Sequence, residues 1–205
     1  MRKLYDIILY ILMSLGAITA IYEFFESSEL KFMLSIFILW VLTIIYRKLH
    51  PEKQKLAKIL SIAFFVLYAI IALELLIFGR YSMIDYYSSY EEYSKTGLVL
   101  VPFKTISEYI PYIFTSRTAL YNIIGNIAIF MPFGIFLPTI SNTFKRFVPF
   151  TLITIFTIIT VEIVQFLTMR GVCDIDDLIL NLLGAEISFF ILKLPFLQNK
   201  SAENQ

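Results

Sequence analysis

Six apolar runs, each long enough or nearly long enough to cross a lipid bilayer as a helix, constrain this chain more than any other feature. They cover residues 4–25, 32–46, 59–78, 122–140, 147–168 and 178–194. A helix needs about 20 apolar residues to cross the hydrocarbon core. The sequence therefore predicts an all-α integral membrane protein, a bundle of about six transmembrane helices.

The composition agrees with lipid as the solvent of this chain. Of its 205 residues, 59% are hydrophobic and only 16% are charged, whereas soluble proteins average about 25% charged residues. The formal net charge is +1, so no bulk charge indicates a nucleic-acid partner. A signal peptide would also begin with basic residues followed by an apolar run, but residues 17–20 make a poor cleavage site, and we expect a retained helix.

Basic residues in the short loops predict the orientation of the helices. Residues 47–58 carry five Lys or Arg and one Glu, and further basic residues lie at the N-terminus, between the fourth and fifth runs, and in the tail. With six spans, all of these segments fall on one side, which the positive-inside rule assigns to the cytoplasm. Both termini are then cytoplasmic. We divide the chain into two N-terminal helices with a basic loop (1–58), a four-helix domain (59–194) and a cytoplasmic tail (195–205).

The long loop between the third and fourth runs, residues 79–121, is predicted to lie on the opposite, outer side. It holds eight of the 13 tyrosines, a residue that favours the membrane–water interface. Phe103, Ile106, Ile110, Ile113 and Phe114 recur at helical spacing with polar residues between them. This pattern predicts a short amphipathic helix on or in the outer leaflet, broken or kinked by Pro111.

Polar side chains gather at the outer ends of the last three apolar runs. Placing a charged group at the bilayer centre costs roughly 2.5–3.5 kcal/mol on insertion scales. Such a group therefore indicates a structural or functional role that offsets the cost. Under the predicted topology these side chains meet in a polar pocket that opens to the outer leaflet. The candidate ligand-binding residues are Asn122, Asn126, Glu162, Gln165, Arg170, Asp174, Asp176, Asp177 and Asn181.

Counts of single residue types limit the chemistry of this pocket. The one histidine, His50, lies in the basic loop, which argues against a histidine-based zinc site and against a Ser-His-Asp triad. The aspartates at 174–177 lack the glycine and distal glutamate of an EF-hand loop, and we expect no metal and no cofactor. If a reaction occurs, Glu162, Asp174 and Asp177 are the candidate catalytic groups. Each residue taken alone also has a structural explanation. An aspartate can cap a helix, and an Asn or Gln can hydrogen-bond one helix to another.

Two ordered motifs resemble the signatures of the VanZ-like family. The first is Asn-Ile-Ile-Gly-Asn-Ile-Ala-Ile-Phe-Met-Pro-Phe-Gly at 122–134. The second is Val-Glu-Ile-Val-Gln at 161–165, then Arg-Gly at 170–171 and Asp-Ile-Asp-Asp-Leu-Ile-Leu-Asn-Leu-Leu-Gly-Ala at 174–185. Val-Pro-Phe at 101–103 is similar to a further element of the family. The resemblance covers roughly residues 60–192, and Glu186 departs from it, because a small or apolar residue is expected there.

The resemblance implies a membrane protein of the bacterial cytoplasmic membrane linked to resistance to teicoplanin and related (lipo)glycopeptides. The partner would be a membrane lipid, a lipid-linked peptidoglycan precursor or the lipoglycopeptide itself, and no reaction is implied. Three functions remain open: a ligand-binding resistance factor, a membrane enzyme acting on a lipid-linked cell-wall substrate, and a scaffold whose polar residues only hold helices together. Transport is less attractive, because no internal repeat is seen. The oligomeric state is not predicted.

Overall fold

Helices make up most of the computed structural model, which describes residues 54–78 and 89–193 together with positions 11, 12, 15, 16, 38, 41, 42, 45 and 46. The predicted helices 4–25 and 32–46 lie outside the described residues, apart from those positions, which are helical. The tail 195–205 also lies outside them. The chain divides into two compact units, Met1–Ala72 and Leu73–Gln205. The domain division at residues 58 and 194 stays a prediction.

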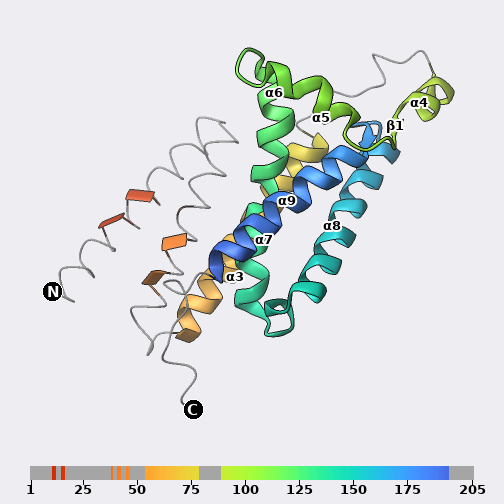
Figure 1. The fold of residues 1–205 in the computed structure, drawn as a ribbon. Helices are drawn as coiled ribbons and strands as arrows, with labels where there is room; N and C mark the ends of the chain where they lie inside the picture. Colours follow the sequence, from red (N-terminus) through yellow and green to blue (C-terminus); the bar gives the residue numbers. More distant parts are fainter. Residues whose placement is uncertain are drawn as a thin grey trace. The chain divides into compact units, whose positions relative to one another are not determined.

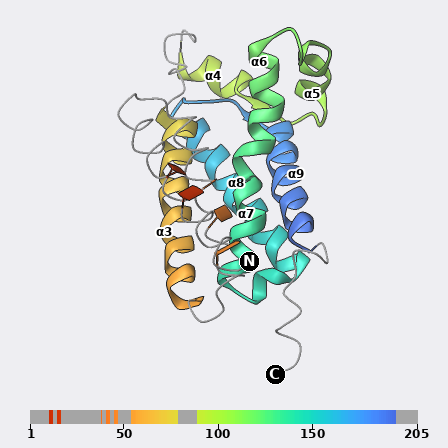
Figure 2. The same cartoon turned by 90° about the vertical axis from the view of Figure 1, so that its left-hand side faces the viewer.

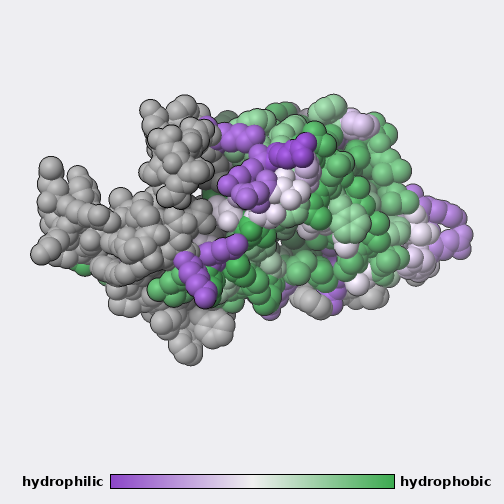
Figure 3. Space-filling view, turned by 90° about the horizontal axis from the view of Figure 1, so that it is seen from below, coloured by the Kyte–Doolittle hydropathy of each residue, from purple (hydrophilic) through white to green (hydrophobic). Residues whose placement is uncertain are grey.

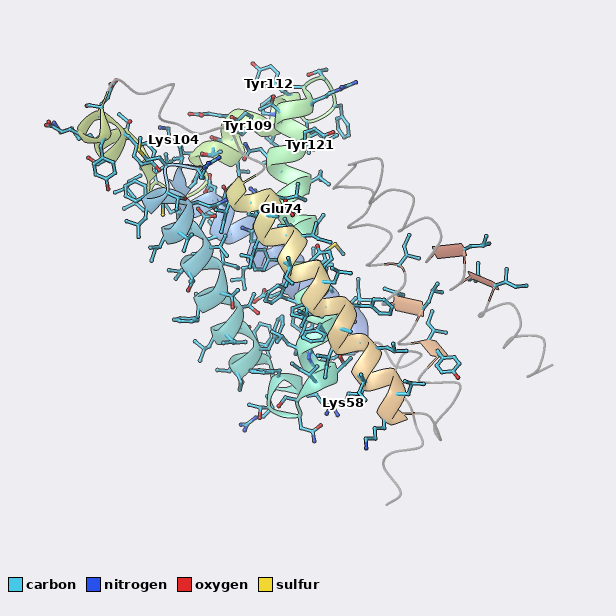
Figure 4. The ribbon with its side chains drawn as sticks, turned by 180° about the vertical axis from the view of Figure 1, so that it is seen from behind. Lys58, Glu74, Lys104, Tyr109, Tyr112 and Tyr121 are labelled. Carbon is cyan, nitrogen blue, oxygen red and sulfur yellow. The ribbon has the colours of Figure 1, made fainter. Side chains whose placement is uncertain are left out.

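The third apolar run forms a helix that ends in a wider turn. Helix α3 (Gln54–Leu73) continues into the π-helical segment η2 (Glu74–Phe78). In Figure 4, Lys58 and Glu74 lie toward opposite ends of this helical run. The stretch Lys58–Ile77 is long and apolar enough to cross a membrane, as the sequence predicts.

The second unit contains a bundle of three long helical runs. The first of them is α6 (Arg117–Leu120), the π-helical η5 (Tyr121–Gly125) and α7 (Asn126–Ile140) in succession, followed by η6 (Thr143–Lys145), α8 (Phe147–Leu167) and α9 (Ile175–Leu192). Figures 1 and 2 show α7 and α9 side by side, with η6 at one end of the bundle and α5 and α6 at the other.

Among the described residues, three helices could cross a membrane by length and composition. They are Lys58–Ile77, Arg117–Ile140 and Phe147–Leu167. Helix α9 begins three residues before the predicted start at 178, because Asp174 caps it and accepts a hydrogen bond from the backbone N–H of Asp176 at 2.9 Å. The helical membrane fold is therefore confirmed, while the number of six spans stays a prediction.

Helix α8 has one face turned to the bundle and one turned outward. Phe150, Thr154, Ile158 and Gln165 are almost fully buried, and their spacings of four and seven residues, one and two helical turns, place them on one stripe. The opposite stripe exposes large apolar side chains, at Val148, Leu152, Phe156, Ile159, Ile163 and Leu167. Such an outward face suits lipid and not water. In the view of Figure 3, hydrophobic side chains cover much of the described surface, and hydrophilic ones form separate patches.

Small residues let α7 and α9 approach so closely that their backbones touch. A Cβ added to Gly184 would collide with the carbonyl of Ile127, and one added to Gly134 would collide with the carbonyl of Ala185. Close contact through glycine is a common way to pack helices in lipid. Ser188 of α9 donates a hydrogen bond to the carbonyl of Met131 at 2.5 Å, just before Pro132. The two helices are thus joined by packing and by a polar contact.

The end of the bundle near η6 is held by aromatic packing. The rings of Phe150 and Phe189 stack with their centroids 4.4 Å apart, and the ammonium of Lys193 lies 4.3 Å from the Phe189 centroid. Glu186, the departure from the family pattern, is half-buried, and its Oε1 accepts a hydrogen bond from Thr151 at 3.5 Å. Glu186 therefore contacts α8 without preventing close packing of α7 against α9.

The described part of the long loop folds over the other end of the bundle. It forms α4 (Tyr90–Thr96), β1 (Leu98–Val99), α5 (Lys104–Tyr109) and the 3-10 helix η4 (Ile110–Tyr112). Strand β1 pairs in parallel with β2 (Cys173–Asp174), so that Leu98 lies opposite Cys173 and Val99 opposite Asp174. The predicted helix is present as α5, and it passes into 3-10 geometry where Pro111 follows.

Candidate functional site

Polar side chains from α7 and α9 meet directly inside the second unit. The side-chain Nδ2 of Asn126, the first residue of α7, donates a short hydrogen bond to Oδ1 of Asp177 in the first turn of α9. Both residues are 6% exposed. Asn181 lies one turn further along α9 and is 3% exposed, on the same helix face as Asp177. Among the described residues, its Oδ1 has no hydrogen-bond partner.

Glu162 adds a carboxylate from α8 to the same region. It is 6% exposed, and its charge acts on the Cys173 thiol. Burial raises the pKa of Cys173 above its ordinary value of 9.0, and the negative charges of Glu162, Asp174 and Asp177 raise it further. Carboxylates from α8 and from the start of α9 therefore lie within electrostatic range of one sulfur, since the Coulomb interaction weakens with distance. We call Asn126, Glu162, Asp177 and Asn181 the polar cluster.

Gln165 lies one turn beyond Glu162 in α8, and its side chain binds a backbone carbonyl. Its Nε2 donates a hydrogen bond of 2.7 Å to the carbonyl of Leu76, in the π-helical η2. The Gln165 side chain is 1% exposed. A π turn leaves backbone carbonyls with altered partners, and the Gln165 amide satisfies one of them. Gln165 therefore ties η2 to α8 at the edge of the polar cluster.

The other two aspartates hold the long loop onto the start of α9. The carboxylate of Asp176, which is fully buried, accepts hydrogen bonds from the backbone N–H groups of Phe103 at 2.5 Å and Ile106 at 3.0 Å. Asp174 Oδ2 accepts one from the Thr105 hydroxyl at 2.5 Å. A carboxylate on the N–H groups of a first helical turn is the favoured arrangement at that end of a helix.

These bonds explain an unusual backbone at Phe103. This residue has φ 64° and ψ 6°, in the left-handed region, which costs a residue other than glycine about 1–3 kcal/mol. Hydrogen bonds to a charged acceptor contribute about 1.5–3 kcal/mol each, so Asp176 can offset this cost. Asp174 and Asp176 thus act as anchors of the loop in this structure, and their predicted ligand-binding role stays a prediction.

Asn122 and Arg170 lie near the polar cluster in the chain and are half-buried. The sequence places Asn122 on one face with Asn126 by assuming α-helical spacing, but residues 121–125 form the π-helical η5, which changes the rotation between the two residues. Arg170 follows α8, and its backbone N–H donates to the carbonyl of Gln165 at 2.8 Å. Their ligand-binding roles stay predictions.

Sequence reasoning missed two residues that build this end of the molecule. Tyr93 looks like one more interfacial tyrosine, but it is fully buried, stacks on Phe166 with centroids 5.1 Å apart, and its hydroxyl lies 2.6 Å from the carbonyl of Gly171. Thr105 binds Asp174 as described above. No periodicity marks either residue, because their partners lie about 70 positions further along the chain.

The polar cluster offers hydrogen-bond acceptors and negative charge in a buried place. Asp177, Glu162 and the Asn181 Oδ1 are acceptors, and Asn126 Nδ2 uses one of its two N–H groups on Asp177. In the part of the chain that the structure describes, no group of three or more His, Cys, Asp or Glu side chains could hold a metal ion. The arrangement suits a ligand that presents N–H or O–H donors.

Fold and site together define a helical membrane protein with a buried polar cluster at one end of its helices. Comparison with known protein families matches the VanZ/LLP1 family over residues 65–197. This match covers more than half of the chain, and the protein belongs to the VanZ/LLP1 family, as the resemblance of its motifs suggests. A search of curated proteins found no match, and neither did a search of solved structures.

Proposed function

We propose that this VanZ-family membrane protein lies in the bacterial cytoplasmic membrane and contributes to resistance to teicoplanin-type (lipo)glycopeptides by binding a ligand at the polar cluster. The observation that carries the proposal is the buried Oδ1 of Asn181, which has no hydrogen-bond partner among the described residues. Leaving such an acceptor unsatisfied costs about 1–3 kcal/mol. A donor group on a ligand would recover this free energy, whereas a purely structural role would leave it lost.

The position of the cluster along the helices supports the proposed ligand class. Glu162 and Asp177 lie within two turns of the bundle end that carries α4 and α5, and Asn126 directly follows η5, which α5 contacts. The basic loops predict this end to be the outer one. Glycopeptides and lipid-linked peptidoglycan precursors both act at the outer membrane surface and both carry amide and amine donors. Binding of either one, or of a membrane lipid with such a group, would lower the access of the drug to its target.

A second candidate function is a membrane enzyme acting on a lipid-linked cell-wall substrate. The observation in its favour is that Glu162 and Asp177 both raise the pKa of the Cys173 thiol, so both carboxylates lie within electrostatic range of one sulfur. One carboxylate could then serve as general acid or base. Cys173 is a poor nucleophile in this scheme, because its raised pKa keeps the thiol protonated.

Teicoplanin susceptibility of a sensitive Gram-positive host tests the proposal. The host expresses the wild type, Glu162→Gln, Asp177→Asn or Asn181→Leu, with membrane levels compared by immunoblot. The matched controls are Glu91→Gln in α4 and Asn142→Leu before η6, since both side chains are exposed. We expect protection by the wild type and both controls, and loss of protection in the three cluster variants at equal protein levels.

Other outcomes have distinct meanings. Equal protection by all six proteins at equal levels would show that the polar cluster has no part in resistance. A parallel fall of protein level and protection in the cluster variants would favour the scaffold role. If the wild type itself gives no protection, the antibiotic role does not apply to this chain. Turnover of a lipid-linked precursor by purified wild type, lost in Glu162→Gln, would favour the enzyme.

A further inference from the structure

The long loop exposes an apolar surface that the proposed function does not use. Residues 98–114, which we call the apolar arm, run from β1 through α5 and η4. The arm leaves large apolar side chains uncovered at Leu100 (65% exposed), Val101 (63%), Phe103 (62%) and Phe114 (97%). Single exposed apolar residues are ordinary, but several of them together on one short segment mark an interaction surface.

The neighbouring helix α4 carries more exposed charged residues for its length than the arm does. Glu91, Glu92 and Lys95 of α4 are all exposed, and Glu91 and Lys95 form an ion pair of 2.7 Å with side chains 78% and 70% exposed. Charged side chains exposed to this degree belong in water. Within one loop, then, α4 carries a surface suited to water, and the arm carries a surface suited to a less polar surrounding.

The arm also adjoins a helix that could cross the membrane. Helix α5 contacts η5, and η4 contacts α6, so the arm packs at the end of the membrane-spanning run Arg117–Ile140. Leu120, Tyr121 and Ile124 of that run are exposed, and they extend the apolar surface from the arm down the helix. Figure 4 shows Tyr109, Tyr112 and Tyr121 at this same end. Tyrosines of this kind are typical of the interface between lipid and water.

We infer that the apolar arm is inserted into the membrane interface, with Phe103, Ile110 and Phe114 among the lipid acyl chains and α4 in water. Lys104, Ser107 and Glu108 are exposed on the arm and lie at the level of the headgroups, as on other interfacial helices. Asp174 and Asp176 hold the arm in this position through Thr105, Phe103 and Ile106. This inference goes beyond the proposed function, because it stands on the surface of the arm and not on the polar cluster.

Tryptophan fluorescence in lipid vesicles tests the insertion. Trp40 is the only tryptophan, so Trp40→Phe provides a silent background in which Phe114→Trp or Tyr90→Trp is the sole reporter. Tyr90 is the matched control, because it is 54% exposed but belongs to α4. The full-length proteins are reconstituted into phosphatidylcholine vesicles with either ordinary acyl chains or chains brominated near the headgroup.

We expect the Phe114→Trp reporter to emit at shorter wavelength than the Tyr90→Trp reporter and to lose emission in the brominated vesicles. The Tyr90→Trp reporter should be quenched only by aqueous iodide. If Phe114→Trp fails to fold, Tyr112→Trp replaces it, since Tyr112 is 58% exposed on the same arm. Quenching of the arm reporter by iodide and not by bromine would overturn the inference and place the arm in water. A reporter protected from both quenchers would also overturn it, because a second protein surface would then cover the arm.

Discussion

Cys173 reports on the charges of the site, because its pKa depends on carboxylates from two helices. Burial raises the pKa of the thiol, and the negative charges of Glu162, Asp174 and Asp177 raise it further by opposing formation of the thiolate. Removing one negative charge must therefore lower the pKa toward the ordinary value of 9.0. The thiolate is the form that reacts with alkylating reagents.

We predict that Glu162→Gln and Asp177→Asn each shift the pH profile of Cys173 alkylation to lower pH, so that labelling at a fixed pH becomes faster. The sequence contains one cysteine, so the rate of modification by N-ethylmaleimide measures this thiol without competing sites. Glu91→Gln should leave the profile unchanged, since Glu91 lies exposed in α4. An unchanged profile in Glu162→Gln would show that Glu162 lies away from Cys173.

At this scale the three neighbouring aspartates show what sequence reasoning can and cannot resolve. Their number and their position before an apolar run predict both caps and ligand contacts. In the structure Asp174 and Asp176 bind the long loop, whereas Asp177 binds Asn126 on α7. Adjacent positions on a helix start point in different directions, so each carboxylate meets a different element.

The contact between α7 and α9 depends on glycine at the level of whole elements. A Cβ at Gly184 would meet the carbonyl of Ile127 on the facing backbone, and backbone cannot move aside as a side chain can. Gly125 offers a matched control, because a Cβ added there would have nothing within 4 Å among the described residues. Gly125 lies in the helical run that contains α7, and Gly184 lies in α9. They differ in that only Gly184 faces a neighbouring backbone closely.

We predict that Gly184→Ala destabilises the protein by about 1–3 kcal/mol or more, the usual cost of overpacking, whereas Gly125→Ala is close to neutral. Thermal unfolding of the purified protein in detergent, followed by circular dichroism, measures the difference. Equal midpoints for the two variants would contradict the close approach of α9 to Ile127. Sequence motifs place glycine at both positions but do not distinguish the one in contact from the one in open space.

At the scale of the whole molecule, the basic loops predict the orientation in the membrane. The segments rich in Lys and Arg, at the N-terminus, at 47–58, at 145–146 and in the tail, fall on one side only if the number of spans is even between the two termini. With six spans, the positive-inside rule predicts that both termini lie in the cytoplasm and that the loop 79–121 lies outside.

We predict that a fluorescent protein fused after residue 205 is fluorescent in a bacterial host, and that alkaline phosphatase fused after residue 95 is active. The fluorescent protein folds only in the cytoplasm and the phosphatase only outside it. Each reporter therefore shows on which side of the membrane its fusion point lies. Active phosphatase fused after residue 145 would contradict the orientation, since that loop is predicted to be cytoplasmic. This measurement also tests the number of spans before the long loop.

The sequence by itself determined the class of this protein and the approximate bounds of its helices. Apolar runs about as long as the hydrocarbon core is thick are expected to be helical, because a helix satisfies every backbone hydrogen bond within its own segment. The described runs accordingly appear as α3, α6–α7, α8 and α9 close to their expected positions. Ordered motifs along the chain likewise sufficed for the family.

Only the tertiary structure decided which polar groups meet. Asn126 and Asp177 are 51 positions apart, Tyr93 and Gly171 are 78 apart, and Gln165 and Leu76 are 89 apart. Periodicity describes a face of one helix but carries no information about which face of another helix it meets. The crossing of α7 and α9 at Gly184, and the fold of the loop over their ends, select Asn126, Glu162, Asp177 and Asn181 as the polar cluster.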